Sequence, residues 1–259
     1  MSSFSRIKPV SKVILMVFIG LSTFFFLSAC EGDEVEENNR SEIAEELTEP
    51  GSATYTGYSE ATDNGYAWAK VTLQGDDITE VELMEVLSTG NEKDYDTYKY
   101  EPSVKAYQEM PERFIGADSA DVDVYTGATH SCEKYIEAVA RALDYAEGGL
   151  EGAYYDGTFQ GESIKTEYGY AVALVTIKDD EISDVKLDEY GGEGEKKDFD
   201  IYEWDAAVEA HQEMPERFIE ANSTEVDLYS NATQSSIRYK EAVGNALHHA
   251  SKKPEEDLE

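Results

Sequence analysis

The feature that most constrains the fold of this 259-residue chain is an internal duplication at an offset of 104 residues. The octapeptide Gln108–Ile115 recurs without change as Gln212–Ile219, and shorter matches around it keep the same offset without a gap. A unit of about 100 residues is a normal size for one domain and is too long for a solenoid repeat. The sequence therefore predicts two tandem domains, over residues 51–147 and 155–251, with a glycine-rich linker between them.

Each unit begins with a strand pattern and continues with a helical one. Residues 66–73 and 78–86 alternate between apolar and polar side chains around a Gly-Asp turn, which predicts a β-hairpin. A helical segment is expected near residues 102–116. Because Pro111 lies inside this segment, we expect two short helices, with Pro111 in the first turn of the second.

The last element of each unit is predicted to be an amphipathic helix. In the first unit, Ile136, Val139, Ala140 and Leu143 recur at the spacing of one helix face. In the second unit, the matching face is formed by Tyr239, Val243, Ala246 and Leu247. The expected fold class is α+β, in which each domain is a twisted antiparallel sheet packed with helices.

The N-terminus has the pattern of an export signal. Residues 1–29 contain three basic and no acidic residues, and their apolar run ends in Leu27-Ser28-Ala29-Cys30. A retained membrane helix is the alternative, since the run is near the lower length limit for one. The tetrapeptide resembles the lipobox of bacterial lipoproteins, which implies cleavage before Cys30 and lipidation of its thiol. We therefore expect a lipoprotein signal peptide over residues 1–29 and a lipid-anchored protein on the extracytoplasmic face of the cell membrane.

The charge of the chain excludes one class of partner and leaves two explanations open. Acidic residues number 56 and basic residues 21, which gives a net charge of −35. Such a surface repels phosphates, so nucleic acid is not an expected partner. The acidity either keeps an exported protein soluble or reflects a saline habitat in which salt screens the self-repulsion. Residues 30–50, which are acidic and poor in large apolar side chains, are expected to form a tether after the lipidated cysteine.

A short motif before the last helix of the first unit suits a bulky anionic group. Thr126, Gly127 and Ala128 are small enough for such a group to approach the backbone closely. Thr129 follows at the expected helix start, where free N–H groups and the helix dipole favour a phosphate. From these residues alone, a simple N-cap role for Thr129 is the stronger interpretation.

The same motif resembles a known attachment sequence. Asp-x-x-Thr-Gly-Ala-Thr is similar to the flavinylation motif of the FMN-binding domain family, and it is matched at Asp123, Thr126, Gly127, Ala128 and Thr129. The resemblance implies FMN held by a phosphoester to Thr129, attached by a dedicated flavin transferase. A closer likeness is to PplA-type surface lipoproteins of extracellular electron transfer. It implies a membrane dehydrogenase and quinone pool as electron donor, and extracellular electron acceptors.

The second unit departs from the motif and leaves its modification open. It has Asp227, Ser230 and Thr233 at the matching positions, but Asn231 replaces the glycine. Asn adopts a left-handed backbone more readily than most residues, so Thr233 remains a candidate for a second FMN.

Four further residues near the motifs have two interpretations each. His130 either touches the phosphate or is a surface residue, and Cys132 is either a redox thiol or an inert small residue. Tyr125 and Tyr229 either stack on the flavin ring or belong to the core. Since no general acid, base or nucleophile stands out, an electron carrier is favoured over an enzyme with its own substrate. The alternative is a flavin-free surface lipoprotein that binds a ligand or a partner protein.

Overall fold

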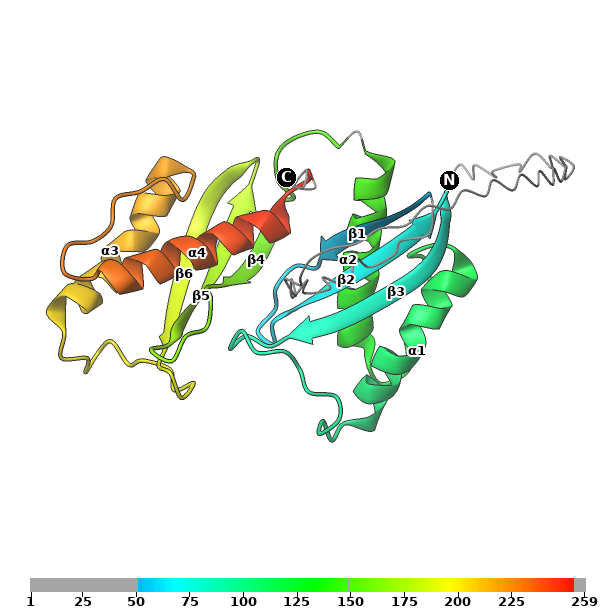
Figure 1. Cartoon of the computed structure of the whole chain (residues 1–259), viewed down its shortest axis with the longest axis horizontal. Coiled ribbons are helices and arrows are strands. Elements are labelled where there is room, and N and C mark those ends of the chain that lie inside the picture. Colours follow the sequence, from blue (N-terminus) through cyan, green and yellow to red (C-terminus); the bar gives the residue numbers. More distant parts are fainter. Residues whose placement is uncertain (1–50, 149, 254–259) are drawn as a thin grey trace, which may run out of the picture. The chain divides into compact units, whose positions relative to one another are not determined.

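A computed structural model describes residues 51–148 and 150–253 (Figure 1). The expected signal peptide, the lipidated Cys30 and the acidic tether lie outside the described residues. Among the helices of the described part, none combines the length and the apolar character needed to cross a membrane. Residues 51–147 form the first repeat and residues 155–251 form the second repeat.

The first repeat is a three-stranded antiparallel sheet followed by two helices. Its strands lie in the order β1 (Ser52–Tyr58), β2 (Tyr66–Gln74) and β3 (Asp77–Val86), and its helices are α1 (Glu101–Ala117) and α2 (Thr129–Glu147). The predicted hairpin is thus confirmed as β2 and β3. Helix α2 packs against β1 and β2, and helix α1 packs against β3 (Figure 1).

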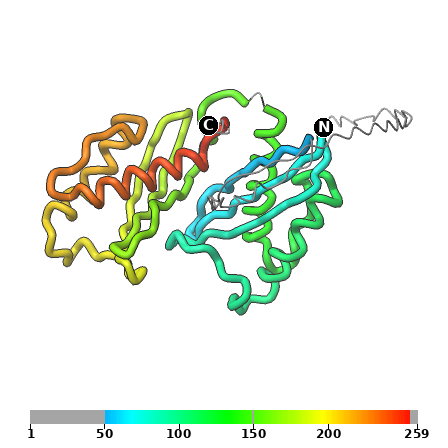
Figure 2. Tube along the Cα trace, in the orientation of Figure 1, coloured from blue at the N-terminus to red at the C-terminus, as the bar shows by residue number. Residues whose placement is uncertain are grey.

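The second repeat has the same elements in the same order (Figure 2). These are β4 (Gly157–Glu162), β5 (Tyr170–Lys178), β6 (Glu181–Tyr190), α3 (Asp205–Ala221) and α4 (Thr233–Ala250). Its strands again form an antiparallel sheet in sequence order. The mixed α and β composition with two antiparallel sheets agrees with the predicted fold class.

One face of each sheet forms the core, and the helices cover it closely. Along β2, Ala69, Val71 and Leu73 are buried while Lys70 and Gln74 are exposed, as expected for a sheet with one covered face.

Glycine makes part of this close packing possible. A Cβ atom at Gly57 of β1 would lie 2.1 Å from the carbonyl oxygen of Ala138 in α2. At Gly161 of β4 it would lie 2.3 Å from the carbonyl oxygen of Ala242 in α4. Both repeats therefore need a residue without a side chain where the first strand passes its last helix.

The prediction that Pro111 separates two short helices is wrong. Helix α1 runs continuously through Pro111, and α3 runs through Pro215 in the same way. A proline removes one backbone hydrogen bond from a helix. Met110 and Phe114 are both fully buried, so core packing holds the helix on both sides of the proline.

The predicted apolar face of the last helix is confirmed in the second repeat and confirmed in part in the first, where Ile136 and Leu143 pack against the core. All four predicted residues of α4 are buried, but in α2 only Val139 is buried, and Ile136, Ala140 and Leu143 are half-buried. The most buried face of α2 includes polar side chains as well as apolar ones. This face is formed by Ser131, Cys132, Lys134, Tyr135, Ala138, Val139, Arg141, Ala142 and Tyr145.

Candidate functional site

The motif of the first repeat forms a tight turn immediately before α2. The N–H of Ala128 donates a hydrogen bond to the carbonyl of Tyr125 at 3.0 Å, with Thr126 and Gly127 between them. Gly127 has a φ of 87°, which is the left-handed geometry of the third residue in a type II turn. Asn231 has a φ of 62° at the same position of the second repeat. The replacement of glycine by asparagine therefore leaves this backbone geometry intact.

Thr129 is the first residue of α2 and does not cap it. The N-cap is Ala128, which is buried and has no side chain to bond the helix end. This corrects the prediction of an N-cap role and leaves the exposed side chain of Thr129 beside the free N–H groups of the helix. Thr233 has the same position in α4, after the N-cap Ala232.

Two side chains, one in α1 and one in the residue before it, form hydrogen bonds to the backbone of the motif. The Arg113 guanidinium donates a hydrogen bond to the carbonyl oxygen of Asp123 at 2.9 Å, and the Tyr100 hydroxyl donates to the carbonyl oxygen of Gly127 at 2.9 Å. The side chains of Asp123 and Thr126 are exposed. In the second repeat Asp227 and Ser230 are exposed as well, and Arg217 bonds the carbonyl oxygen of Asp227 at 3.5 Å.

The motif opens into a cavity of about 630 Å³. This volume lies within the usual range for small-molecule and cofactor sites. The motif contributes Gly127, Ala128, Thr129 and His130 to the wall, and the exposed rings of Tyr98 and Tyr100 line it as well. The remaining wall comes from residues 62–64 and 87–89 and from Glu85, Lys93, Ser103, Ser131 and Lys134.

A buried carboxylate with two lysines lies in the wall of this cavity. Glu85 on β3 accepts hydrogen bonds from Lys93 at 3.2 Å and from Lys134 on α2 at 2.9 Å. The hydroxyls of Tyr95 and Tyr135 donate to the same carboxylate at 2.6 and 2.9 Å. Burial alone would raise the pKa of Glu85, but the charge of Lys134 and these hydrogen bonds outweigh it and lower the pKa to about 2. Glu85 is therefore ionised at neutral pH.

The second repeat keeps this charged cluster with different side chains. Glu189 accepts hydrogen bonds from Lys197 at 2.6 Å, from Arg238 at 2.9 Å and from Tyr239 at 2.9 Å. Its pKa is also lowered, because the hydrogen bond and charge of Lys197 outweigh the effect of burial.

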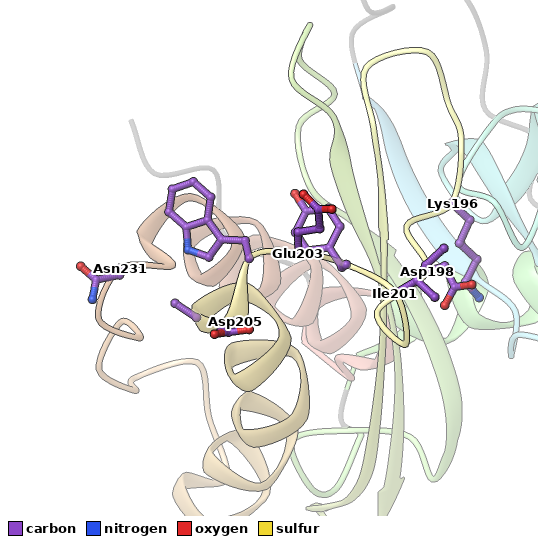
Figure 3. A pocket seen from close by; sticks show the side chains of 9 residues that line it. Lys196, Asp198, Ile201, Glu203, Asp205 and Asn231 are labelled. Atoms are coloured by element: carbon purple, nitrogen blue, oxygen red, sulfur yellow. The ribbon is translucent and has the colours of Figure 1, made fainter.

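The cavity beside the second motif has a more apolar rim. It measures about 1020 Å³ and is lined in part by Asn231, Ile201 and Trp204. Ile201 and Trp204 are largely exposed. Figure 3 shows Asn231, from the loop before α4, across from the start of α3, where Asp205 lies. Thr233 is not among the residues that line this cavity.

Cys132, His130 and Tyr125 lie in different surroundings. Cys132 is fully buried, its sulfur accepts the N–H of Tyr125 at 3.2 Å, and burial raises the pKa of its thiol. This environment fits an inert residue rather than a redox thiol. His130 is exposed at the rim of the cavity. Tyr125 lies below the guanidinium of Arg113 at 5.5 Å and does not line the cavity.

Sequence reasoning missed the aromatic wall and the charged cluster. Tyr98 and Tyr100 line the cavity in place of the expected Tyr125. A signal for the cluster was present in the duplication, because Glu85, Lys93 and Lys134 each have a residue of the same charge at the matching position. These positions are Glu189, Lys197 and Arg238.

Comparison with known proteins finds a family match over part of the chain. Residues 64–144 match the model of the FMN-binding domain family, which supports an FMN-binding domain in the first repeat and indicates a flavoprotein. A crystal structure of the CPE2226 protein from Clostridium perfringens is similar at 26% sequence identity, covering 38% of this chain and 88% of that chain, with a TM-score of 0.33. None of the curated proteins matches the chain.

Proposed function

We propose that this protein is a membrane-anchored extracytoplasmic flavoprotein that carries electrons through FMN esterified to Thr129. The observation that carries the proposal is the position of the Thr129 side chain. It is exposed, it is the first residue of α2, and it adjoins a cavity within the segment that matches the FMN-binding domain family.

The residues around Thr129 fit a flavin nucleotide in size and chemistry. The cavity volume suits a cofactor of this class, and a phosphate on the Thr129 hydroxyl would lie beside the free N–H groups at the start of α2. Gly127 lets the turn pack closely against α1, because a Cβ atom there would lie 3.2 Å from the Pro102 side chain. The exposed rings of Tyr98 and Tyr100 provide flat apolar surfaces for a flavin ring.

FMN supplies the electron-transfer chemistry, and the protein supplies attachment and position. The phosphoester keeps the cofactor from diffusing away outside the cell. The N–H groups of α2 stabilise the phosphate, and the hydrogen bonds from Tyr100 and Arg113 to the motif backbone fix the turn that presents Thr129. Asp123, Thr126 and Ala128 complete the motif that a flavin transferase would recognise.

Thr233 is proposed as a second attachment site. Asn231 adopts the left-handed φ that the turn needs, and Thr233 is exposed at the first position of α4. Asp227 and Ser230 occupy the matching positions of the motif. These features support two flavins in tandem domains, although the family match covers the first repeat alone.

The lipobox and the PplA-type likeness support the anchor and the partners. Lipidation of Cys30 would hold the protein at the cell membrane, and residues 31–50 would separate the folded part from it. A membrane dehydrogenase with its quinone pool would donate electrons, and extracellular acceptors would receive them. Replacing Cys30 with Ser should move the protein from the membrane fraction to the soluble fraction of its host. Membrane retention of that variant would contradict lipid anchoring.

Flavin attachment is tested by intact mass and in-gel flavin fluorescence after denaturation. The full chain is exported in a host with an active flavin transferase, beside Thr129→Ala, Thr233→Ala and the double variant. We expect Thr129→Ala to lose the FMN mass from the first repeat. Thr54→Ala is the matched control, since Thr54 is an exposed threonine of β1 outside the lining of the cavity, and it should keep the full mass.

The pattern of masses decides between one flavin, two flavins and none. Fluorescence that survives in each single variant and disappears in the double variant indicates two flavins. Loss of all fluorescence in Thr129→Ala alone indicates one. A parent protein without added mass, despite an active transferase, would contradict the proposal and leave the flavin-free lipoprotein as the function.

A further inference from the structure

We propose that Lys93, Lys134 and Glu85 give the flavin cavity one net positive charge that raises the reduction potential of the FMN. This inference rests on the proposed function and names how the same site controls the cofactor. The buried charges of these three side chains take no part in the ester bond to Thr129.

The cluster contains two ammonium groups and one carboxylate, all withdrawn from water. Lys93, Lys134 and Glu85 are 7%, 6% and 4% exposed. A buried charge is costly unless an opposite charge accompanies it, and one carboxylate compensates one of the two lysines. The other charged groups of the lining, Asp63 and His130, are exposed, where water screens them. The inner wall of the cavity therefore holds one uncompensated positive charge.

The position of Thr129 indicates which part of the cofactor meets this charge. An ester at its exposed hydroxyl would hold the phosphate at the rim, and the cavity beside it has the volume to receive the rest of the cofactor. Polar groups accompany the lysines at the inner wall. Lys93 donates to the Ser103 hydroxyl at 2.8 Å, and the Ser103 and Ser131 hydroxyls lie 3.3 Å apart. The geometry favours the polar edge of the flavin ring as the group that approaches Lys93 and Lys134.

The flavin ring gains negative charge on reduction, and the positive charge of the cluster interacts more favourably with the reduced ring. Two electrons and one proton added to the neutral oxidised ring give a reduced ring with one negative charge. A fixed positive charge nearby stabilises the reduced ring more than the oxidised one, which raises the reduction potential. The electrons come from the membrane donor in the proposed function and from dithionite in the experiment below.

The test measures the midpoint potential of the flavin-loaded protein by dithionite titration with reference dyes. A Thr233→Ala background leaves one flavin to observe. Lys93→Met removes the excess charge and leaves Glu85 paired with Lys134. We expect at least a tenfold fall in the ratio of reduced to oxidised FMN at a fixed potential, which is about 30 mV for a two-electron couple. Lys93→Arg keeps the charge and should restore most of the potential.

The matched control removes a positive charge from the surface of the same repeat. Lys105 forms an exposed pair with Glu101 on α1, so Lys105→Met should leave the potential unchanged. If Lys93→Met does not fold, Lys134→Met and Lys134→Arg repeat the test, since the second repeat has Arg238 at that position.

Each outcome separates this inference from the proposed function. A parent protein without FMN contradicts the proposed function and with it this inference. A loaded Lys93→Met variant with the potential of the parent overturns the inference alone. Loss of FMN loading in Lys93→Met, with a normal melting curve, also overturns it, because the cluster would then serve attachment.

Discussion

The two repeats have the same backbone and the same buried charges but differ in the hydroxyl groups around them. Glu85 is held by two lysines and two tyrosines, whereas Glu189 is held by Lys197, Arg238 and one tyrosine. At the position of Tyr95 the second repeat has Phe199. Ala207 replaces Ser103, and Trp204 replaces Tyr100, which bonds the motif turn in the first repeat. The duplication has thus retained the turn and the charge balance while the polar contacts diverged.

The features that both repeats share indicate what the fold itself requires. A buried carboxylate with two cations lies at the same place in both repeats, so we infer that this charge balance belongs to the shared architecture. The hydroxyls of Tyr95 and Ser103 and the glycine of the motif occur in the first repeat alone, and they lie within the segment that matches the FMN-binding domain family. The features specific to the first repeat are therefore the ones we expect to support cofactor attachment most strongly.

The largest effect is expected when either buried carboxylate is removed. Glu85→Leu leaves two lysines uncompensated in the core and should lower the free energy of unfolding by about 3–5 kcal/mol. Glu189→Leu should lower it less, because Lys197 and Arg238 have side chains 17% and 12% exposed and can reach water, against 7% for each lysine of the first repeat. Urea titration of the purified protein measures both values.

A surface control separates charge burial from a general loss of negative charge. Glu82 lies on β3 and is exposed, so Glu82→Leu should change the free energy of unfolding by less than about 0.5 kcal/mol. Equal losses for Glu85→Leu and Glu189→Leu would show that exposure of the cations does not distinguish the repeats.

A smaller effect is expected from exchanging the hydroxyl at positions 95 and 199. The Tyr95 hydroxyl donates to the Glu85 carboxylate at 2.6 Å. Tyr95→Phe should therefore lower the free energy of unfolding by roughly 1.5–3 kcal/mol, as for a hydrogen bond to a charged group. The reverse change, Phe199→Tyr, should gain less, because Glu189 already has three partners. Thermal unfolding of both variants beside the parent tests the pair, and a neutral Tyr95→Phe would contradict this account.

The next effect concerns the motif turn. A left-handed backbone costs an ordinary residue about 1–2 kcal/mol of conformational free energy. Gly127→Val should abolish FMN attachment at Thr129, because valine resists a φ of 87° and its side chain would press on Pro102. Gly127→Asn should keep more of it than Gly127→Val, since Asn231 adopts a left-handed φ at the same position, while its Cβ atom meets Pro102 as that of valine does.

The reverse exchange sharpens this test. Asn231→Gly completes the glycine position of the second motif and should raise the FMN content of Thr233, measured as the second mass increment. If Gly127→Asn loses all flavin, the transferase reads the glycine itself rather than the shape of the turn.

Local pattern predicted much of this fold, and long-range packing decided the rest. The duplication and the hairpins follow from periodicity and turn residues within a few positions of one another. The continuity of α1 does not, because the burial of Met110 and Phe114 in the tertiary core overrides the effect of Pro111.

The candidate site divides in the same way. Thr129 and its motif are contiguous and could be found from the sequence, including the left-handed position that Asn231 shares with Gly127. The charged cluster could not be placed, because Glu85 and Lys134 are 49 residues apart and come together through the packing of α2 on the sheet. The most buried face of α2 also includes polar side chains, which a count of apolar residues does not find.

The smallest expected effect concerns the aromatic pair next to each cluster. Tyr95 stacks on Tyr107 in the first repeat, and Phe199 stacks on His211 in the second, with ring centres 4.0 Å apart in both. The Nδ1 atom of His211 is buried and has no hydrogen-bond partner among the described residues. Burial lowers the pKa of His211, so the folded protein holds this ring neutral below the pH at which the unfolded chain protonates it.

The sign of the pH dependence follows from this depressed pKa. Above a pH of about 6.5 the ring is neutral in both states, and its contribution to stability is fully present. As the pH falls below that value, the unfolded chain binds a proton that the folded protein does not, so stability falls toward the folded pKa. His249, whose pKa burial lowers to about 3, adds to the same slope.

His211→Tyr places the residue type of Tyr107 against Phe199 and should remove part of this slope. We expect the loss of stability between pH 7 and pH 5 to become smaller by less than about 1 kcal/mol, with His249 still contributing. Urea titrations at three pH values measure it, and the exposed His130 provides the control as His130→Tyr, which should leave the slope unchanged. An unchanged slope in His211→Tyr would mean that the ring reaches water in the folded protein.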